Sequence, residues 1–196
     1  MPSSEVHASL RNLPPTTPPK DRVTFDSAFD GLFNKAFGKD LTPEIRAELK
    51  KRGVDLDHLQ AAYPFGVFKD SVDFAAKTWF PELPAEQAWF QVGVRNLEGF
   101  YDTFIGKPMF ALLRLIGPRR TAARMKANFR NANNYSESKL VDIGPHELQL
   151  WMNDSGETRF FVAGVMFRGL QLAGATNVKI DELATDENGT VYRITW

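Results

Sequence analysis

Seven basic side chains lie between residues 107 and 135, and no acidic residue interrupts them. Guanidinium and ammonium groups attract anions, and a cluster of one sign concentrates that attraction on one part of a surface. On a helix, residues four positions apart share a face, so Arg120 lies beside Arg124 and Lys126 beside Arg130. We therefore predict an electropositive face for an anionic ligand or a protein partner. The residues predicted to face the anion are Arg119, Arg120, Arg124, Lys126 and Arg130.

A second interpretation of these cations is that acidic residues elsewhere in the fold neutralise them. The partners that the sequence offers are Asp181, Glu182, Asp186 and Glu187. The chain holds 24 basic and 24 acidic residues, so its net charge of zero identifies no partner by itself. That balance, together with the lack of a helix-turn-helix or RNA-binding signature, argues against nucleic acid as the partner.

Enzymatic chemistry has few candidate groups in this chain. The absence of cysteine excludes a thiol nucleophile, a cysteine-ligated zinc site and an iron–sulfur cluster. Asp55, Asp57 and His58 have metal-ligating side chains, but acidic residues there are typical of a helix start. We predict no metal and no cofactor. An enzyme, a hydrolase or a reductase, with His146 or His58 as the general acid or base, is kept as an alternative function.

The apolar segment from Arg159 to Ala173 carries the candidate pocket. Gly164 and Gly169 lie within this predicted helix, where a missing side chain permits close approach to a sheet. The alternative is that a glycine leaves a gap beside the helix, and that this gap admits a ligand. In that case the pocket is lined by Phe161, Met166, Phe167 and Leu170.

Helical patterns dominate the chain as far as Tyr135. Phenylalanines recur every four residues at positions 25, 29, 33 and 37, which predicts one buried helix face that begins at Asp26 and ends at Gly38. Further helices are predicted over Thr42–Arg52, Ser71–Trp79, Pro84–Gly106, Met109–Leu115 and Thr121–Phe129.

The pattern changes after Tyr135. Strands are predicted over Lys139–Ile143, Glu147–Met152, Val178–Leu183 and Thr190–Trp196, with the helix from Arg159 to Ala173 between the second and the third. We therefore predict an α+β fold: a helical N-terminal half packed with a small antiparallel sheet in a strand-strand-helix-strand-strand C-terminal unit.

Residues 1–20 form a proline-rich segment with no apolar run, which predicts a disordered tail and no secretory signal. Residues 21–196 are predicted to form a single domain. Nowhere do about 18 apolar residues follow one another, so we expect no transmembrane segment. These features favour a cytoplasmic location.

Several short motifs resemble, in their order and spacing, the myxobacterial paralogous family of unknown function. They are Leu49–Asp57 (LKKRGVDLD), Ala62–Pro64 (AYP), Gly99–Gly106 (GFYDTFIG), and an ending with Gly164, Gly169, Gly174, a hairpin and Trp196. The likeness covers residues 22–196. This family implies no activity, so it assigns no catalytic residues.

The C-terminal unit resembles, more distantly, the ligand-binding fold of TRAPP components, vinyl-reductase-type domains and haem–nitric-oxide-binding domains. That resemblance implies an apolar pocket between helices and sheet, or a surface for dimerisation. The haem-propionate motif is altered here, because Glu137 replaces a serine and Lys139 replaces an arginine. No histidine lies on a suitable helix, so we expect no haem.

We therefore predict a non-enzymatic regulatory module, a sensor or adaptor. It would bind a small apolar ligand in the pocket, or an anionic ligand or a protein partner through the basic face. The alternatives are the enzyme described above and a structural dimerisation domain that forms a homodimer.

Overall fold

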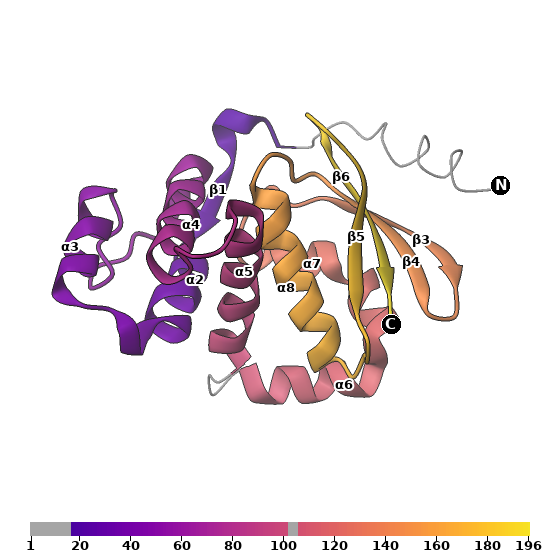
Figure 1. Ribbon diagram of the computed structural model, residues 1–196. Coiled ribbons are helices and arrows are strands. Elements are labelled where there is room, and N and C mark those ends of the chain that lie inside the picture. The colour runs from indigo at the N-terminus through magenta and orange to yellow at the C-terminus, as the bar shows by residue number, and fades with distance from the viewer. Residues whose placement is uncertain (1–16, 102–105) are drawn as a thin grey trace.

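The computed structural model describes residues 17–101 and 106–196 (Figure 1). Most helices of the N-terminal half lie on one side of the molecule and the C-terminal antiparallel sheet on the other, with the helical segment 106–130 beside the sheet (Figure 1). The predicted α+β class is confirmed. Most of the predicted tail lies outside the described residues, and its last residues enter a short 3-10 helix, η1 (Pro19–Asp21). Within the described part of the chain, no helix has the length and apolar character needed to cross a membrane.

The helical side begins close to where the sequence patterns place it. Thr42 caps one helix as predicted, because its side chain accepts a hydrogen bond from the Ile45 amide at 3.3 Å. That helix is α3 (Pro43–Lys51), and the others are α2 (Asp26–Phe29), the π-helix η2 (Asp30–Ala36), η3 (Gly38–Asp40), α4 (Phe65–Trp79), α5 (Ala85–Tyr101), α6 (Gly106–Ala123), α7 (Met125–Arg130) and α8 (Thr158–Leu172).

The strands form two antiparallel sheets. They are β1 (Val23–Phe25), β2 (Ala62–Pro64), β3 (Ser138–Gly144), β4 (Glu147–Met152), β5 (Lys179–Asp186) and β6 (Gly189–Thr195). The C-terminal sheet has the order β3-β4-β6-β5, with α8 between β4 and β5 in the chain as predicted. Leu148, Leu150 and Met152 of β4 join the main core with α8. The sequence patterns missed the small sheet of β1 and β2.

The phenylalanine stripe is buried, with one correction. Phe29, Phe33 and Phe37 lie in the core, but Phe25 ends strand β1 instead of opening a helix. A spacing of four residues exceeds the 3.6 residues of an α-helical turn, and the wider turns of η2 suit that spacing. Gly38 opens η3, so the helix ends two residues earlier than predicted, at Ala36.

Glycines set the distance between α5 and α8. A Cβ atom at Gly93 would lie 2.1 Å from the Phe161 carbonyl oxygen, and one at Gly164 would lie 2.0 Å from that of Phe90. Neither position therefore accepts a side chain without separating the two helices. Gly164 serves the contact between two helices, not the contact with the sheet that we expected.

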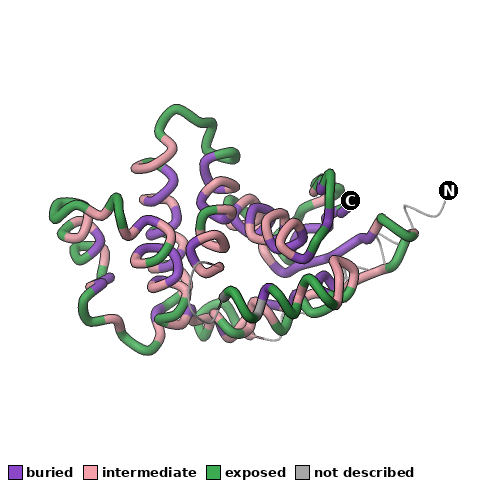
Figure 2. The backbone as a smooth tube through the Cα atoms, turned by 90° about the horizontal axis from the view of Figure 1, so that it is seen from below, coloured by how far each residue is buried: buried purple, intermediate pink, exposed green. Residues whose placement is uncertain are grey.

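Helix α6 lies on the surface and is bent at Gly117. The sequence predicts two helices divided at this glycine, and its backbone angles (φ 79°, ψ 169°) indeed break α6 there. No residue between Ala111 and Arg120 is fully buried (Figure 2). Farther along, Ala122 and Met125 enter the core and fix the end of α6 and the start of α7.

Candidate functional site

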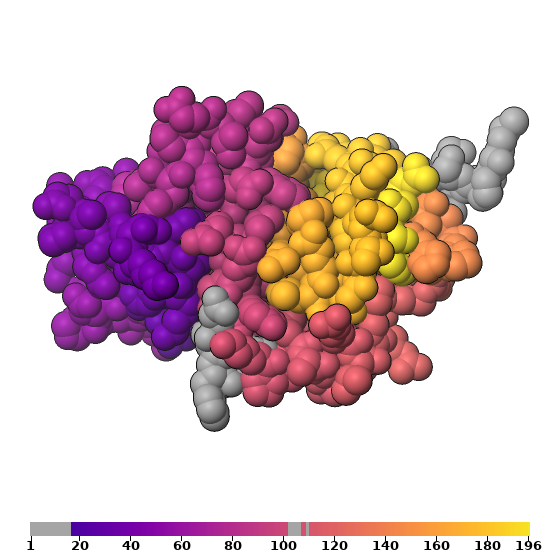
Figure 3. Space-filling view, turned by 60° about the horizontal axis from the view of Figure 1, so that its bottom comes forward, coloured from indigo at the N-terminus to yellow at the C-terminus, as the bar shows by residue number. Residues whose placement is uncertain are grey.

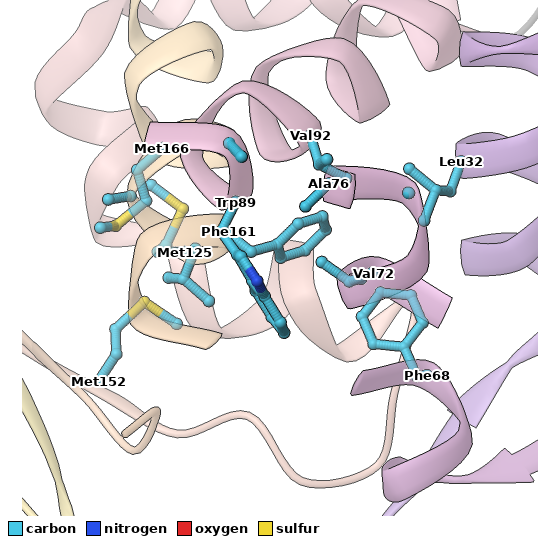
Figure 4. Close-up of a cluster of buried hydrophobic side chains, with 14 of the residues drawn as sticks. Leu32, Phe68, Val72, Ala76, Trp89, Val92, Met125, Met152, Phe161 and Met166 are labelled. Carbon is cyan, nitrogen blue, oxygen red and sulfur yellow. The ribbon is translucent and has the colours of Figure 1, made fainter. Parts of the chain in front are cut away.

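A cavity of about 330 Å³ lies among α4, α5, α7 and α8, and most of its lining residues are apolar. Phe68 and Val72 of α4, Trp89 of α5, Met125 of α7 and Phe161 of α8 line it, and Figure 4 shows these side chains in one buried cluster. The volume falls within the range of about 300 to 1,000 Å³ that is usual for small-molecule sites. The cavity is thus large enough for a small organic molecule.

One part of the cavity wall is polar, and it is built by chain segments that hydrogen bond to one another. Asn133 accepts hydrogen bonds from the amides of Tyr135 (3.0 Å) and Ser136 (2.8 Å) through Oδ1. Asn153 accepts from the Glu137 amide (2.7 Å) and donates to the Tyr135 carbonyl (2.9 Å). The two asparagines therefore hold the segment after α7 against the end of β4.

Asp154 follows β4 and presents a buried carboxyl to this polar wall. Its Oδ2 accepts a hydrogen bond from the Tyr192 hydroxyl, and its Oδ1 is buried with no hydrogen-bond partner. Burial raises the pKa of Asp154 to about 7, against the hydrogen bond from Tyr192, which lowers it. The carboxyl group therefore changes protonation state near neutral pH.

Thr24 and Tyr135 complete the polar wall. Thr24 on β1 is 2% exposed, and its hydroxyl oxygen is also buried with no hydrogen-bond partner. Burial raises the pKa of Tyr135 to about 12, although the Thr24 hydroxyl and the Arg22 charge lower it and the Asp154 charge raises it further. Tyr135 thus lies within electrostatic range of both Thr24 and Asp154 and stays protonated at neutral pH.

The predicted pocket residues fall on two sides of α8. Phe161 lines the cavity, whereas Met166 and Leu170 are fully buried in the core. Phe167 packs against Phe90 of α5 with 5.4 Å between ring centroids. A different face of α8 from the one that carries Met166 and Leu170 lines the cavity. Its residues are Thr158, Phe161, Val162, Val165 and Gly169. These positions follow helical spacing, so starting from Phe161 and stepping by three or four residues would have found them.

Three of the five predicted anion-binding residues form ion pairs within the chain. Arg119 pairs with Asp142, and both Lys126 and Arg130 pair with Glu137. These acids lie just after the basic segment, and none of the four acids named as alternative partners takes this role. Arg120 and Arg124 are exposed, and neither forms an ion pair with any described residue.

The two histidines of the described part lie away from the cavity. The His58 side chain is 86% exposed, with its Nδ1 3.8 Å from the Asp55 carboxylate. His146 lies in the turn between β3 and β4, where its ring packs against that of Trp196 with 5.9 Å between centroids. Among residues 17–101 and 106–196, no three histidine, cysteine or acidic side chains gather in a way that could hold a metal ion.

A family model described as "Protein of unknown function (DUF2378)" matches residues 22–196. This span equals the one over which the motifs resemble a family of unknown function. No curated protein sequence matches the chain.

Solved structures of H-NOX proteins share the fold. The unliganded Fe(II) H-NOX protein from K. algicida superposes with a TM-score of 0.58 at 11% identity, over 86% of this chain and 94% of that one. An oxygen-binding H-NOX domain related to soluble guanylate cyclases gives a TM-score of 0.60 at 12% identity, over 86% of this chain and 90% of that one. At such identities the likeness shows the fold alone, and it agrees with the resemblance to haem–nitric-oxide-binding domains.

Proposed function

This chain belongs to the DUF2378 family, whose function is unknown. From its cavity, we propose that it is a sensor or adaptor domain that binds a small, mostly apolar molecule. The carrying observation is the cavity of about 330 Å³ among α4, α5, α7 and α8. Its apolar wall favours a hydrophobic ligand, and its few polar groups would orient that ligand. The neighbours of known structure support this role, since one of them is named for binding oxygen.

The residues of the cavity do not fit haem, the group that the H-NOX neighbours suggest. Haem iron usually takes a histidine as its axial ligand, and neither His58 nor His146 lines the cavity. Tyr135 lines it, but a phenol with a pKa of about 12 does not readily give the phenolate that iron binds. Met125 and Met152 also line it, yet a thioether usually serves beside a histidine. We therefore propose an organic ligand.

Filling the cavity tests this function. Val165 lines the cavity from α8, and Val165→Phe adds an aromatic ring there. We expect this variant to bind Nile red, a neutral hydrophobic dye, at least tenfold more weakly than the unchanged protein. Val141→Phe is the matched control, because Val141 packs against Trp151 and Val191 in a separate cluster. Equal dye affinity in all three proteins, measured by fluorescence titration, would contradict a ligand role for the cavity.

The second candidate function is binding of an acidic protein partner through the basic surface of α6. Arg114, Arg120 and Arg124 are exposed without an ion pair to any described residue, and the segment lies along one edge of the molecule (Figure 3). Leu115, 85% exposed, adds an apolar contact on the same helix. An exposed apolar side chain among unneutralised cations favours a protein surface over a free anion.

Salt titration tests the basic surface. Polyglutamate serves as the acidic probe, and its binding should weaken strongly between 20 mM and 500 mM NaCl. The double variant Arg120→Glu/Arg124→Glu should abolish polyglutamate binding. The control Lys39→Glu reverses the charge of an exposed residue in η3 and should change the affinity by less than twofold. Binding that does not change with salt or with the double variant would refute this role.

The remaining alternatives stay as predictions. An enzyme that uses His146 or His58 should lose turnover in the alanine variant of one of them, in a screen of hydrolase and reductase substrates. A homodimer should show twice the monomer mass in light scattering.

A further inference from the structure

Most polar groups that line the cavity already have partners in the protein. The Lys69 ammonium group lies 2.8 Å from the Glu157 carboxylate. The Arg22 guanidinium donates to the Thr17 carbonyl at 3.3 Å and lies over the Tyr135 ring. Asn133 and Asn153 use their side chains to hold the backbone, as described above. These groups shape the polar wall, and their own contacts occupy them.

Two oxygens of this wall have no partner at full hydrogen-bond geometry, although the Thr24 hydroxyl interacts with the Tyr135 side chain closely enough to lower its pKa. Asp154 Oδ1 and Thr24 Oγ1 are buried, and both residues line the cavity. A buried polar atom without a partner is costly, and such atoms are rare in folded proteins. A carboxylate oxygen accepts hydrogen bonds, and a threonine hydroxyl both donates and accepts. The complementary ligand group both donates and accepts a hydrogen bond.

We propose that this polar wall recognises the hydroxyl group of an otherwise apolar alcohol, which donates to Asp154 and accepts from Thr24. This inference rests on the proposed function, since it names the class of molecule that the cavity binds. The apolar remainder of the ligand would lie against Phe68, Trp89 and Phe161.

The charges around the cavity favour a neutral head group. Arg22 lines the same cavity and opposes an ammonium group, whereas the Lys69 charge is already paired with Glu157. The Asp154 carboxylate opposes a ligand carboxylate when it is ionised. A hydroxyl group avoids both conflicts and can bind to either protonation state of Asp154, because both states keep an acceptor oxygen.

Four ligands of one chain length separate the possibilities: decan-1-ol, its methyl ether, decylamine and decanoate. The readout is displacement of Nile red, with the retained ligand identified by native mass spectrometry. We expect decan-1-ol to bind about five- to tenfold more tightly than the ether, which cannot donate a hydrogen bond. Tighter binding of the ether, decylamine or decanoate would overturn the proposal.

Variants of Thr24 test the same site. Thr24→Val removes the hydroxyl at nearly constant shape, and it should weaken binding of decan-1-ol and of the ether by about fivefold each, because the oxygen of either ligand accepts from Thr24. Thr24→Ser keeps the hydroxyl and should bind both ligands as the unchanged protein does, which also guards against a folding defect in the valine variant. Thr176→Val, at an exposed position between α8 and β5, is the control and should bind all four ligands normally.

The two proposals fail in different ways. If no ligand displaces the dye and Val165→Phe has no effect on it, the cavity has no ligand role and the proposed function fails. If the four ligands compete but decan-1-ol has no advantage over the ether, the cavity binds apolar molecules and only the hydroxyl recognition fails.

Discussion

The interior around α8 and the surface of α6 differ in how strongly a change to a single atom affects the stability of the fold. In the interior, a Cβ atom at Gly164 would lie 2.0 Å from a backbone oxygen, and one carboxyl oxygen of Asp154 has no hydrogen-bond partner. On the surface, exposed cations such as Arg120 lie in solvent. The interior contacts have large energetic consequences and leave little trace in the sequence. The surface charges are conspicuous in the sequence and cost little to change.

The basic segment, residues 107–135, contains both neutralised and solvent-exposed cations. Arg119, Lys126 and Arg130 are tied to Asp142 and Glu137, and Arg130 also donates to two backbone carbonyls. Arg120 and Arg124 point to solvent from the same stretch of chain. A run of basic residues in the sequence is therefore not a uniformly basic face in the fold, because Glu137 and Asp142, just before and within β3, neutralise part of it.

Asp154 gives the largest expected effect, through pH. Its pKa is about 7 in the folded chain and 3.8 ordinarily, so the folded state holds a proton that the unfolded state releases. This contribution is fully present below pH 3.8 and is lost as pH rises through 7, so the free energy of unfolding falls across that window. The total loss is on the order of 4 kcal/mol.

Asp154→Asn isolates this effect, because the amide keeps an acceptor for Tyr192 and does not titrate. We measure the free energy of unfolding in urea at pH 4.5, 6.0 and 7.5. The value for the unchanged protein minus the value for the variant should fall as pH rises. Other titrating groups cancel in that difference. Parallel profiles for the two proteins would show that the Asp154 carboxyl is ionised in the folded chain throughout.

Gly164→Ala tests the contact between α5 and α8. The added methyl group meets the Phe90 backbone, so the helices must separate, and we expect a loss of about 3 kcal/mol in the free energy of unfolding. Gly66→Ala is the matched control, since a Cβ at that position in α4 meets nothing within 4 Å. There alanine should be neutral or stabilise by up to about 1 kcal/mol. Equal urea midpoints for the two variants would contradict the close packing.

The sequence predicted the elements better than their contacts. Periodicity in β4 and turn residues around Asn188 identified the C-terminal sheet, because both signals are local. The pairing of β1 with β2 joins residues nearly forty positions apart through two three-residue strands, which are too short for a clear alternation. Gly164 was recognised as a packing residue, but its partner, Gly93 on α5, depends on how two helices cross.

The cavity was harder to predict than the fold. Phe161 was identified from its place on an apolar helix, yet that helix is apolar on almost every side, so its pattern does not show which face lines a cavity. Thr24 and Asp154 come from a short strand and a turn at distant points in the chain. Their unpartnered oxygens follow from tertiary structure alone, and no local pattern signals them.

Arg130→Ala examines the neutralised part of the basic segment. It removes an ion pair to Glu137, whose side chain is 13% exposed, and hydrogen bonds to the carbonyls of Asn134 and Ser136. Lys126 remains beside Glu137 at 2.5 Å and limits the damage, so we expect a loss of about 2 kcal/mol in urea unfolding. Lys126→Ala should cost less, because Lys126 makes no comparable backbone contacts. The reverse order would contradict this division of roles.

Arg120→Ala examines the solvent-exposed part and should have the smallest effect, with an opposite sign. Arg120 and Arg124 are one helical turn apart and repel each other, so removing one charge should stabilise the chain by about 0.3 kcal/mol at 20 mM NaCl. At 1 M NaCl the Debye length is about 3 Å, so the gain should vanish. Urea midpoints at the two salt concentrations measure this. A loss of 1 kcal/mol or more at either concentration would mean that Arg120 has a structural partner, and the basic surface would then lose one of its free charges.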